Sequence, residues 1–341
     1  MAMNERYSRQ IRFAEIGEDR QARIRKQRVL LVGCGALGTH LADMMVRSGV
    51  KSLTIIDRDI LEPSNLQRQT LFTEEDVLQG LPKAAAAELH LSKINAEVET
   101  QGIVADFGSD NAQESANQCD IILDATDNFE TRFLINDVAT KLNKPWIYAA
   151  CVGSKAMTMP IIPGQTACMN CLLEALPDVG GETCDNAGII MPAVLSAVGM
   201  AGAEALKILS GQPEALIRKL RIVDCWAGTN QELNADSARS DCETCSQKKF
   251  PYLSGSKAAS AVSLCGRNTV QVHPASRFTM GFDEVENRAN GIAEVLARNA
   301  HLLKLGARKK ELTLFTDGRA LISGTNDLAE AKALYAQLIG T

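Results

Sequence analysis

Apolar positions in the first part of the chain alternate between short continuous runs and helix-spaced stripes. The run "RVLLV" (28–32) is short, apolar and rich in branched side chains, which predicts a buried strand. The stretch "ALGTHLADMMVRSG" (36–49) has the apolar spacing of a helix, with Gly49 as its end signal. Another strand-like run, "SLTIID" (52–57), follows directly. Strand, helix and strand in this order predict a mononucleotide-binding βαβ unit.

The same alternation continues to about residue 152. Strands and helices that alternate in this way form a twisted sheet with helices on both faces. The pattern therefore predicts an α/β fold with a Rossmann-like, doubly wound, mostly parallel sheet. The further elements are a helix from about Pro82 to Asn95, strands at "VETQGIV", "DIILDATD" and "WIYAAC", and a helix from Phe129 to Leu142.

The pattern changes after Val152. A strand-like "AMTMPII" comes first, followed by a polar Gly-rich loop at 177–188 and a long apolar helix at 190–211. The strand "LRIVDCW" follows this helix, and residues 234–257 are polar. This polar stretch indicates a domain boundary.

The remaining residues predict a small α+β module. Strands are expected at "NTVQVHP", "ELTLFTDG" and "RALISG", with one helix over 282–299 and a last helix over 327–340. We therefore predict a large domain at residues 1–250 and a small one at residues 251–341.

Composition and charge exclude several classes of function. The chain has 36 Lys and Arg against 41 Asp and Glu, with 4% aromatic residues, which is neither the basic surface nor the stacking set of a nucleic-acid-binding protein. The amino terminus "MAMNERYSRQIRF" has no apolar core of a signal peptide, and no run is long enough to span a membrane. A cytoplasmic protein is expected. Its ten cysteines are then better interpreted as metal ligands, reactive thiols and packing residues than as disulfides.

A glycine-rich turn lies between the first predicted strand and helix. Gly33, Gly35 and Gly38 form a G-x-G-x-x-G pattern, which brings backbone amides and a helix amino terminus close to phosphate oxygens. Asp57, at the end of the next strand, is placed to hold a ribose. These residues alone favour a dinucleotide such as NAD.

The polar residues beyond Asp57 change that interpretation. A triphosphate needs cationic donors along its length, and Arg68 and Lys83 are two candidates. Taken singly, each has a structural alternative, a solvated loop for Arg68 and the first turn of a helix for Lys83. Asp127 follows a buried strand and suits Mg²⁺, although it is also placed to cap the helix that begins near Phe129.

Two C-x-x-C pairs predict a metal site. Four thiolates in two such pairs match a closed, tetrahedral structural zinc site. Unligated thiols and a redox dithiol are the alternatives, but neither pair opens a helix of a thioredoxin-like unit. The expected zinc ligands are Cys168, Cys171, Cys242 and Cys245.

The order of these motifs resembles the ThiF and MoeB adenylyltransferases, relatives of ubiquitin-activating enzymes. The matching stretches are "RYSRQ", "GCGALG", "IIDRD", "SNLQRQ", "LPKA", "DATDN", the two C-x-x-C pairs and "TCDNAGI", from Arg6 to Gln247. The resemblance implies that Mg-ATP and not NAD is the ligand. It also implies a substrate, a ubiquitin-like sulfur carrier whose terminal Gly-Gly carboxylate attacks the α-phosphate to give an acyl-adenylate and pyrophosphate.

The resemblance assigns a role to each matching residue. Asp57 would hold the ribose, Arg68 and Lys83 with Asn65 would neutralise the triphosphate, and Asp127 would bind Mg²⁺. Arg9 would reach the active site of a partner protomer, so a homodimer is implied. Many relatives have glycine where this chain has Ala36. The full set assigned to the nucleotide is Gly33, Gly35, Ala36, Gly38, Asp57, Asp59, Ser64, Asn65, Leu66, Gln67, Arg68, Lys83, Asp127 and Asn128.

Cys184 lies in the Gly-rich loop, where some relatives carry a cysteine that joins covalently to the carrier. A working thiol and an inactive one remain equal alternatives for it. The motifs serve both a ThiS-type carrier of thiamine thiazole synthesis and a MoaD-type carrier of molybdopterin synthesis, with the thiamine pathway slightly favoured. A cysteine desulfurase or another sulfur donor would complete the pathway.

The carboxyl-terminal residues from about Tyr252 lie outside this resemblance. "LCGRNTV" lacks the active-site loop pattern of a rhodanese, so Cys265 is interpreted as structural. The small domain is hypothesised to contact the carrier or the dimer partner.

Two other classes of function remain as alternatives. An NAD-dependent oxidoreductase leaves Arg9, Arg68, Lys83 and the C-x-x-C pairs without a role. A non-catalytic, zinc-stapled binding protein would be expected to lack Arg68, Lys83 or Asp127, and all three are present. Within the adenylation chemistry, a peptide is an alternative substrate.

Overall fold

A computed structural model describes residues 3–175, 187–256, 261–264, 268–272, 274, 278–307 and 309–340. The chain divides into two compact units, Met1–Lys257 and Ala258–Thr341. Each unit is described by itself.

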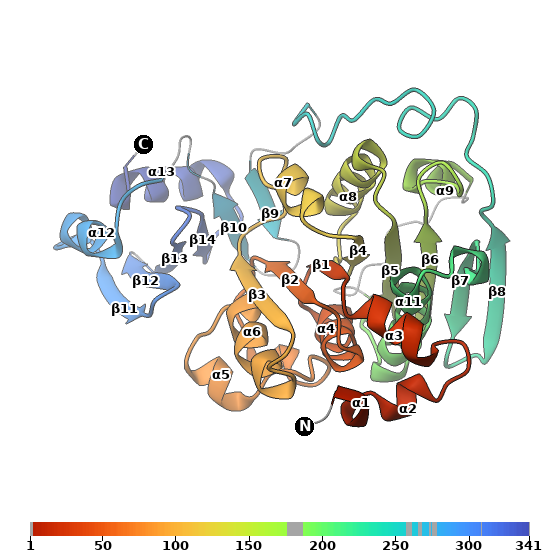
Figure 1. Ribbon diagram of the computed structural model, residues 1–341. Coiled ribbons are helices and arrows are strands. Elements are labelled where there is room, and N and C mark those ends of the chain that lie inside the picture. The colour runs from red at the N-terminus through yellow and green to blue at the C-terminus, as the bar shows by residue number, and fades with distance from the viewer. Residues whose placement is uncertain are drawn as a thin grey trace. The chain divides into compact units, whose positions relative to one another are not determined.

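The described residues of the first unit form an eight-stranded sheet (Figure 1). Its order is β3-β2-β1-β4-β5-β6-β7-β8. Pairs from β3 through β5 are parallel and those from β5 through β8 are antiparallel. The strands are β1 (Arg28–Val32), β2 (Ser52–Asp57), β3 (Glu99–Val104), β4 (Ile121–Asp124), β5 (Trp146–Val152), β6 (Lys155–Ile161), β7 (Lys219–Asp224) and β8 (Thr229–Asn234).

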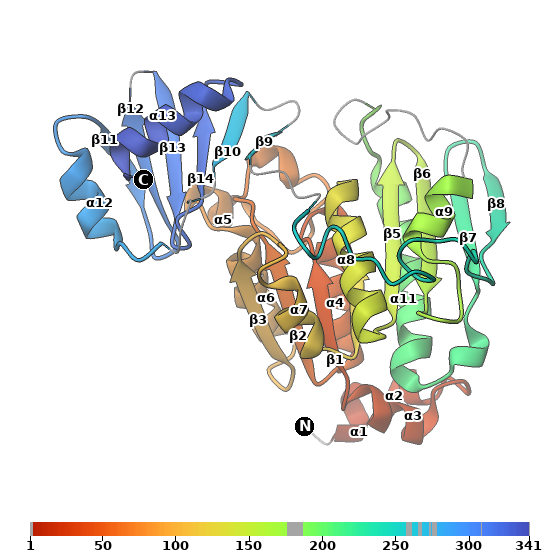
Figure 2. The ribbon, with the colours of Figure 1, turned by 90° about the horizontal axis from the view of Figure 1, so that it is seen from above.

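Helices cover both faces of this sheet, as Figure 2 shows from above. α4, α6 and α11 pack on one face, while α7 and α8 pack on the other. The predicted fold class is therefore confirmed. The helices of this unit are α1 (Met3–Arg6), α2 (Ser8–Ile11), α3 (Gly17–Ile24), α4 (Ala36–Ser48), α5 (Glu74–Leu78), α6 (Lys83–Ile94), α7 (Ala112–Asn117), α8 (Phe129–Leu142), α9 (Met169–Ala175) and α11 (Met191–Ser210), with short 3-10 turns at Pro63–Asn65 and Pro213–Ala215.

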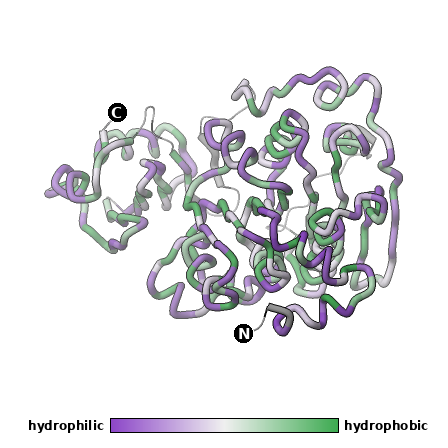
Figure 3. The backbone as a smooth tube through the Cα atoms, in the orientation of Figure 1, coloured by the Kyte–Doolittle hydropathy of each residue, from purple (hydrophilic) through white to green (hydrophobic). Residues whose placement is uncertain are grey.

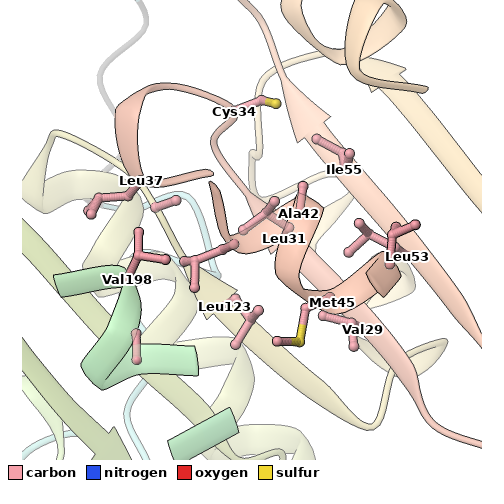
Figure 4. Close-up of a cluster of buried hydrophobic side chains, with 14 of the residues drawn as sticks. Val29, Leu31, Cys34, Leu37, Ala42, Met45, Leu53, Ile55, Leu123 and Val198 are labelled. Carbon is pink, nitrogen blue, oxygen red and sulfur yellow. The ribbon is translucent and has the colours of Figure 1, made fainter. Parts of the chain in front are cut away.

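Strand alternation explains why one apolar run serves two cores. Successive side chains of a strand point to opposite faces of the sheet. In β1, Val29 and Leu31 therefore join the core beneath α4, while Leu30 and Val32 join the core beneath α8. Figure 4 shows the first of these cores, in which side chains of β1, β2 and β4 meet those of α4 and Val198 of α11.

The prediction that no run is long enough to span a membrane is wrong by length and composition, because among the residues that the structure describes α11 passes both tests, although 56% of its most apolar window is buried. Contacts with α4, β5 and β6 account for this burial. The helix thus belongs to the core of the first unit.

A polar connection follows β8 and returns along α8. Much of it is hydrophilic in Figure 3. The Tyr252 ring stacks on Phe133 of α8 with 4.9 Å between ring centroids. The buried carboxylate of Asp137 accepts hydrogen bonds from the backbone amides of Tyr252 and Leu253, at 2.9 and 3.3 Å. Residues 251–256, which the sequence prediction placed in the second domain, therefore pack on the first unit.

The described residues of the second unit form an antiparallel sheet of six strands in the order β11-β12-β13-β14-β10-β9. Its core lies between this sheet and two helices. The elements are β9 (Ala261–Leu264), β10 (Thr269–Val272), α12 (Phe282–Ala289), β11 (Glu294–Arg298), β12 (Leu302–Ala307), β13 (Lys310–Phe315), β14 (Ala320–Ser323) and α13 (Leu328–Leu338).

The helix predicted over 282–299 is wrong in its second half. α12 ends at Ala289, and Gly291 takes a φ of +78°, a left-handed conformation that glycine adopts at low cost. The chain then turns into the edge strand β11, which pairs with β12. Residues of β11 are exposed, so no alternation of buried and exposed positions marked it as a strand.

Candidate active site and metal centre

The glycine loop lies at the carboxyl ends of three neighbouring parallel strands. Val32 of β1 is paired with Ile56 of β2 on one side and with Asp124 of β4 on the other. The loop that follows Val32 is thus flanked by the residues after β2 and the residues after β4. This edge is where doubly wound sheets bind ligands.

Two glycines of the loop are required by close backbone contacts. Gly33 has a φ of +90°, and a Cβ there would lie 2.6 Å from the carbonyl oxygen of Ala125. A Cβ on Gly38 would lie 2.1 Å from the carbonyl oxygen of Gly33. Ala36 is the first residue of α4, a helical position that suits alanine. The amino terminus of α4 therefore lies at the glycine loop, where its free backbone amides can bind an anion.

Asp57, the expected ribose ligand, is fixed by the backbone. Its carboxylate accepts the amide of Cys34 at 2.6 Å and that of Asp59 at 2.7 Å. The pKa of Asp57 lies above its usual value. Burial, together with the charge of Asp59, raises this pKa by more than the charge of Lys83 and the two amides lower it. Lys83 is only 4% exposed and donates from Nζ to Asp59 at 2.8 Å. The carboxylate and the cation predicted from separate motifs thus belong to one network.

Residues 62–70 lie beside the glycine loop. Asn65 is buried, and its side-chain oxygen accepts the amide of Glu62 at 3.1 Å, closing a capping box around the 3-10 turn. The guanidinium of Arg68 donates to the carbonyl of Ser64 at 2.9 Å. Gln69, which sequence reasoning missed, is 3% exposed, and its Nε2 lies 3.8 Å from the position of a Cβ on Gly35. Leu66 is half-buried and Gln67 is exposed.

Asp127 lies on the opposite side of the glycine loop from Asp57. The helix cap that the sequence allowed for Asp127 is instead formed by Asn128, whose side-chain oxygen accepts the amide of Thr131 at 2.9 Å. The Asp127 carboxylate is exposed, and the Asn128 amide approaches it at 3.4 Å. The position leaves this carboxylate available to a cation.

A buried ion pair holds the loop that carries Asp127. Arg132 donates to the fully buried Asp124 at 3.2 Å and to the carbonyl of Thr126 at 2.6 Å. Asp124 also accepts the amide and the hydroxyl of Thr126, at 2.9 and 2.6 Å. The sequence analysis did not identify the pair of Arg132 and Asp124, although both residues lie in the stretch "DATDNFETR".

Arg58 is a further residue at this edge that sequence reasoning did not single out. It follows Asp57 directly, and its Nη1 donates to Asp106, just beyond β3, at 2.9 Å. Its Nε lies 3.9 Å from a carboxylate oxygen of Asp59. Burial lowers the pKa of Arg58, but Asp106, Asp59 and Asp127 outweigh this effect, so the pKa lies above its usual value. The "IIDRD" motif shows where Arg58 lies in the chain but does not show its contact with Asp106.

Arg9 is not near the glycine loop of its own chain. It is exposed on α2, whose neighbour Gln10 donates to the carbonyl of Ser48 at 3.2 Å. The Tyr7 ring packs against Gly49, where a Cβ would lie 2.4 Å from it. Both contacts are at the carboxyl end of α4, whose 13 residues span about 20 Å from the loop.

The four predicted zinc ligands converge. Their sulfur atoms all lie within 4.8 Å of one another. The closest approaches are 3.8 Å for Cys168 and Cys171, 3.6 Å for Cys168 and Cys242, and 3.5 Å for Cys171 and Cys245. Four sulfurs at Zn–S distances of about 2.3 Å in a tetrahedron would lie about 3.8 Å apart, so the donor set fits zinc. The first pair, Cys168 and Cys171, does open a helix, α9, contrary to the sequence prediction, but its sulfurs meet those of the second pair. The cluster joins the start of α9 to the connection after β8.

Other predicted positions fall elsewhere. Cys184 and Cys265 lie outside the described residues. Outside the zinc cluster, the other cysteines of the described residues are Cys34, Cys119 and Cys151, which are buried, and Cys225, which is half-buried.

This fold and edge geometry define the class of protein. The ThiF family matches residues 7–244, and the chain belongs to that family. The described structure is similar to a crystal structure of E. coli MccB with MccA-N7isoASN, with a TM-score of 0.63 and 23% sequence identity over 72% of this chain and 75% of that one, which establishes the shared fold.

Individual relatives extend beyond the family domain. The chain is 45% identical over 339 residues to the sulfur carrier protein ThiS adenylyltransferase of Bacillus subtilis (strain 168), covering 99% of this chain and 100% of the relative. It is 35% identical over 237 residues to the sulfur carrier protein adenylyltransferase of Thermus thermophilus, covering 67% of this chain and 86% of that relative. The Bacillus relative thus matches the second unit as well.

Proposed function

We propose that this protein uses ATP to adenylylate the carboxyl-terminal glycine of a ubiquitin-like sulfur carrier in the cytoplasm. The observation that carries the proposal is the convergence of the glycine loop with Asp57, Lys83 and Asp127 at one edge of the sheet. The full-length similarity to a ThiS adenylyltransferase supports a ThiS-type carrier and thiamine thiazole synthesis. A MoaD-type carrier is the alternative for the same chemistry.

The site supplies positioning and charge stabilisation. Backbone amides at the start of α4 would face the α-phosphate, and Asp57 would accept the ribose hydroxyls. Arg68 and Lys83, with Asn65, would neutralise the triphosphate. Asp127 would hold Mg²⁺, which prefers one or two carboxylates together with phosphate oxygens and would screen the charge of the departing pyrophosphate. The cysteine cluster would hold zinc in a structural role, because its four thiolates already complete a tetrahedral set.

The reaction would need no nucleophile from the protein. A carboxylate oxygen of the carrier attacks the α-phosphorus, the bond from that phosphorus to the bridging oxygen of the β-phosphate breaks, and pyrophosphate leaves. The products are an acyl-adenylate and pyrophosphate, so atoms and charge balance without a side-chain intermediate. Catalysis of this kind comes from orientation and preorganised charges.

A homodimer with Arg9 acting in trans is part of the proposal. Arg9 lies about the length of α4 from its own glycine loop, roughly 20 Å, a distance that an arginine side chain cannot cross. If Arg9 contributes to a nucleotide site, that site belongs to another protomer. Cys184 is retained as a candidate for covalent attachment to the carrier, and a cysteine desulfurase or another donor would provide the sulfur.

The decisive experiment is carrier-dependent exchange of labelled pyrophosphate into ATP, with ThiS-type and MoaD-type carriers in parallel. Asp127→Asn should abolish exchange, because it removes the charge expected to hold Mg²⁺. Asp110→Asn, an exposed acid in the nearby β3–α7 connection, is the matched control and should retain it. Failure of both carriers to support exchange by the wild-type protein would refute the proposal.

A further inference from the structure

Arg58 and Asp106 form an ion pair at the outer end of the candidate nucleotide site. Asp57 of β2 is paired with Val104 of β3, so Arg58 and Asp106 follow neighbouring positions on adjacent strands. In a βαβ nucleotide site the phosphates lie at the glycine loop and the ribose at the acid that ends the second strand. The base therefore extends outward from the ribose, over the ends of β2 and β3.

The guanidinium of Arg58 is held at that place from two sides. Asp106 accepts from Nη1 at 2.9 Å, and Asp59 lies 3.9 Å from Nε. Asp106 is itself fixed, because its carbonyl accepts the side-chain amide of Asn111 at 2.7 Å. The Arg58 side chain is 29% exposed, so part of it borders solvent at the carboxyl ends of the strands. A planar cation oriented by carboxylates at its edge can present its face to an aromatic ring.

The charge around Arg58 distinguishes between two ligands that an arginine at this position could bind, a 2′-phosphate and a neutral base. An arginine beside the ribose acid recognises a 2′-phosphate in NADP-binding proteins. Among the described residues, the carboxylates of Asp57, Asp59 and Asp106 lie close to the cations Arg58 and Lys83, and the charge of Asp127 also acts on Arg58, so the acids outnumber the bases. A further phosphate at this end would meet a net negative surrounding. A neutral base would not be repelled, and it gains from stacking on the guanidinium.

We propose that Arg58, oriented by Asp106, stacks on the adenine ring and determines how tightly the base is held. This inference rests on the proposed use of ATP and adds a residue that recognises the base. Stacking acts on the bound base and not on the reacting phosphate. Loss of Arg58 should therefore raise the KM for ATP and leave kcat nearly unchanged.

The experiment compares a nucleotide with its phosphate chain alone, using the full-length protein. Binding of ATP and of tripolyphosphate, each with Mg²⁺, is measured by calorimetry for the wild type and for Arg58→Met, Arg58→Lys and Asp106→Asn. Arg58→Met should weaken ATP binding by about tenfold and leave tripolyphosphate binding unchanged. Arg58→Lys should resemble it, since an ammonium group lacks the planar face, and Asp106→Asn should have a smaller effect.

Lys83→Met is the matched comparison because Lys83 is assigned to the phosphates, and it should weaken both ligands. Retained tripolyphosphate binding also shows that each Arg58 variant is folded. Equal losses of ATP and tripolyphosphate in Arg58→Met would assign the residue to phosphate charge and overturn the inference, as would unchanged ATP binding. A wild-type protein that binds neither ligand would instead refute the proposed function on which the inference rests.

Discussion

The buried pair of Arg132 and Asp124 gives a prediction whose size follows from the structure. Arg132 is 6% exposed and Asp124 is fully buried, and Arg132 also donates to the carbonyl of Thr126. Its guanidinium lies 5.2 Å from the centroid of the Tyr148 ring. Removing one partner of a buried pair leaves the other charge without compensation, at a cost of about 3–5 kcal/mol. Arg132→Met should lower the free energy of unfolding at neutral pH by that amount.

The loss should depend on pH with a definite sign. Burial raises the pKa of Asp124 even though Arg132 and the Thr126 donors lower it, so without Arg132 the pKa rises further. Between the unfolded pKa of about 3.9 and the folded pKa of the variant, the folded state binds one proton more than the unfolded state. The free energy of unfolding therefore falls as pH rises through this window, by about 1.4 kcal/mol per pH unit. The variant should be closer to the wild type at pH 5 than at pH 8.

Urea unfolding followed by tryptophan fluorescence measures this directly. Trp146 is fully buried and reports loss of the first unit, whereas Trp226 is already 85% exposed. In the double variant Asp124→Asn with Arg132→Met, the buried charge is absent and the loss should shrink to about 1–2 kcal/mol, from the hydrogen bonds alone. A loss in Arg132→Met that is equal at both pH values, or a double variant no more stable than Arg132→Met, would refute the reasoning.

Three further predictions follow from the loop, the metal centre and the amino-terminal segment. Gly38→Ala should abolish ATP binding measured by calorimetry, because its Cβ would overlap a backbone carbonyl, whereas Gly199→Ala, where nothing lies within 4 Å, should keep it. Cys242→Ser should lose zinc measured by elemental analysis and lower the melting temperature; full zinc occupancy in the variant would contradict the four-thiolate site. Mixing the inactive variants Arg9→Ala and Lys83→Met should restore pyrophosphate exchange to about a quarter of the wild-type rate, since half of the dimers would carry one intact site. No recovery in the mixture, with dimers exchanging subunits, would exclude action in trans.

Periodicity in the sequence predicted many of the helices and strands that have a buried face. α8 was placed at its observed ends because its apolar spacing and its buried face agree. β8 was missed and β11 was taken for part of a helix, since the residues of both strands are exposed and carry no alternation. The strand β12 was missed as well although it is largely buried, so exposure to solvent explains the failures at β8 and β11 but not the one at β12.

The candidate site was predictable as a set of motifs but not as a set of pairs. The glycine loop and Asp57 belong to one βαβ unit, formed by β1, α4 and β2, whose geometry is fixed, so spacing in the sequence sufficed to relate them. Arg58 and Asp106 are 48 residues apart, and their contact depends on the register of β2 with β3. A motif in one loop carries no information about that register.

The packing of residues 251–256 on α8 bears on how such a chain can be assembled by gene fusion. The hydrogen bonds from Tyr252 and Leu253 to Asp137 complete the surface of the first unit before the chain leaves it. The second unit, Ala258–Thr341, has an apolar core of its own. A recombination point at Lys257 would therefore separate two self-contained cores. One at residue 250 would remove Tyr252, the aromatic partner of Phe133, from the first unit. Natural shuffling of carboxyl-terminal modules onto this catalytic unit is expected to favour the later position.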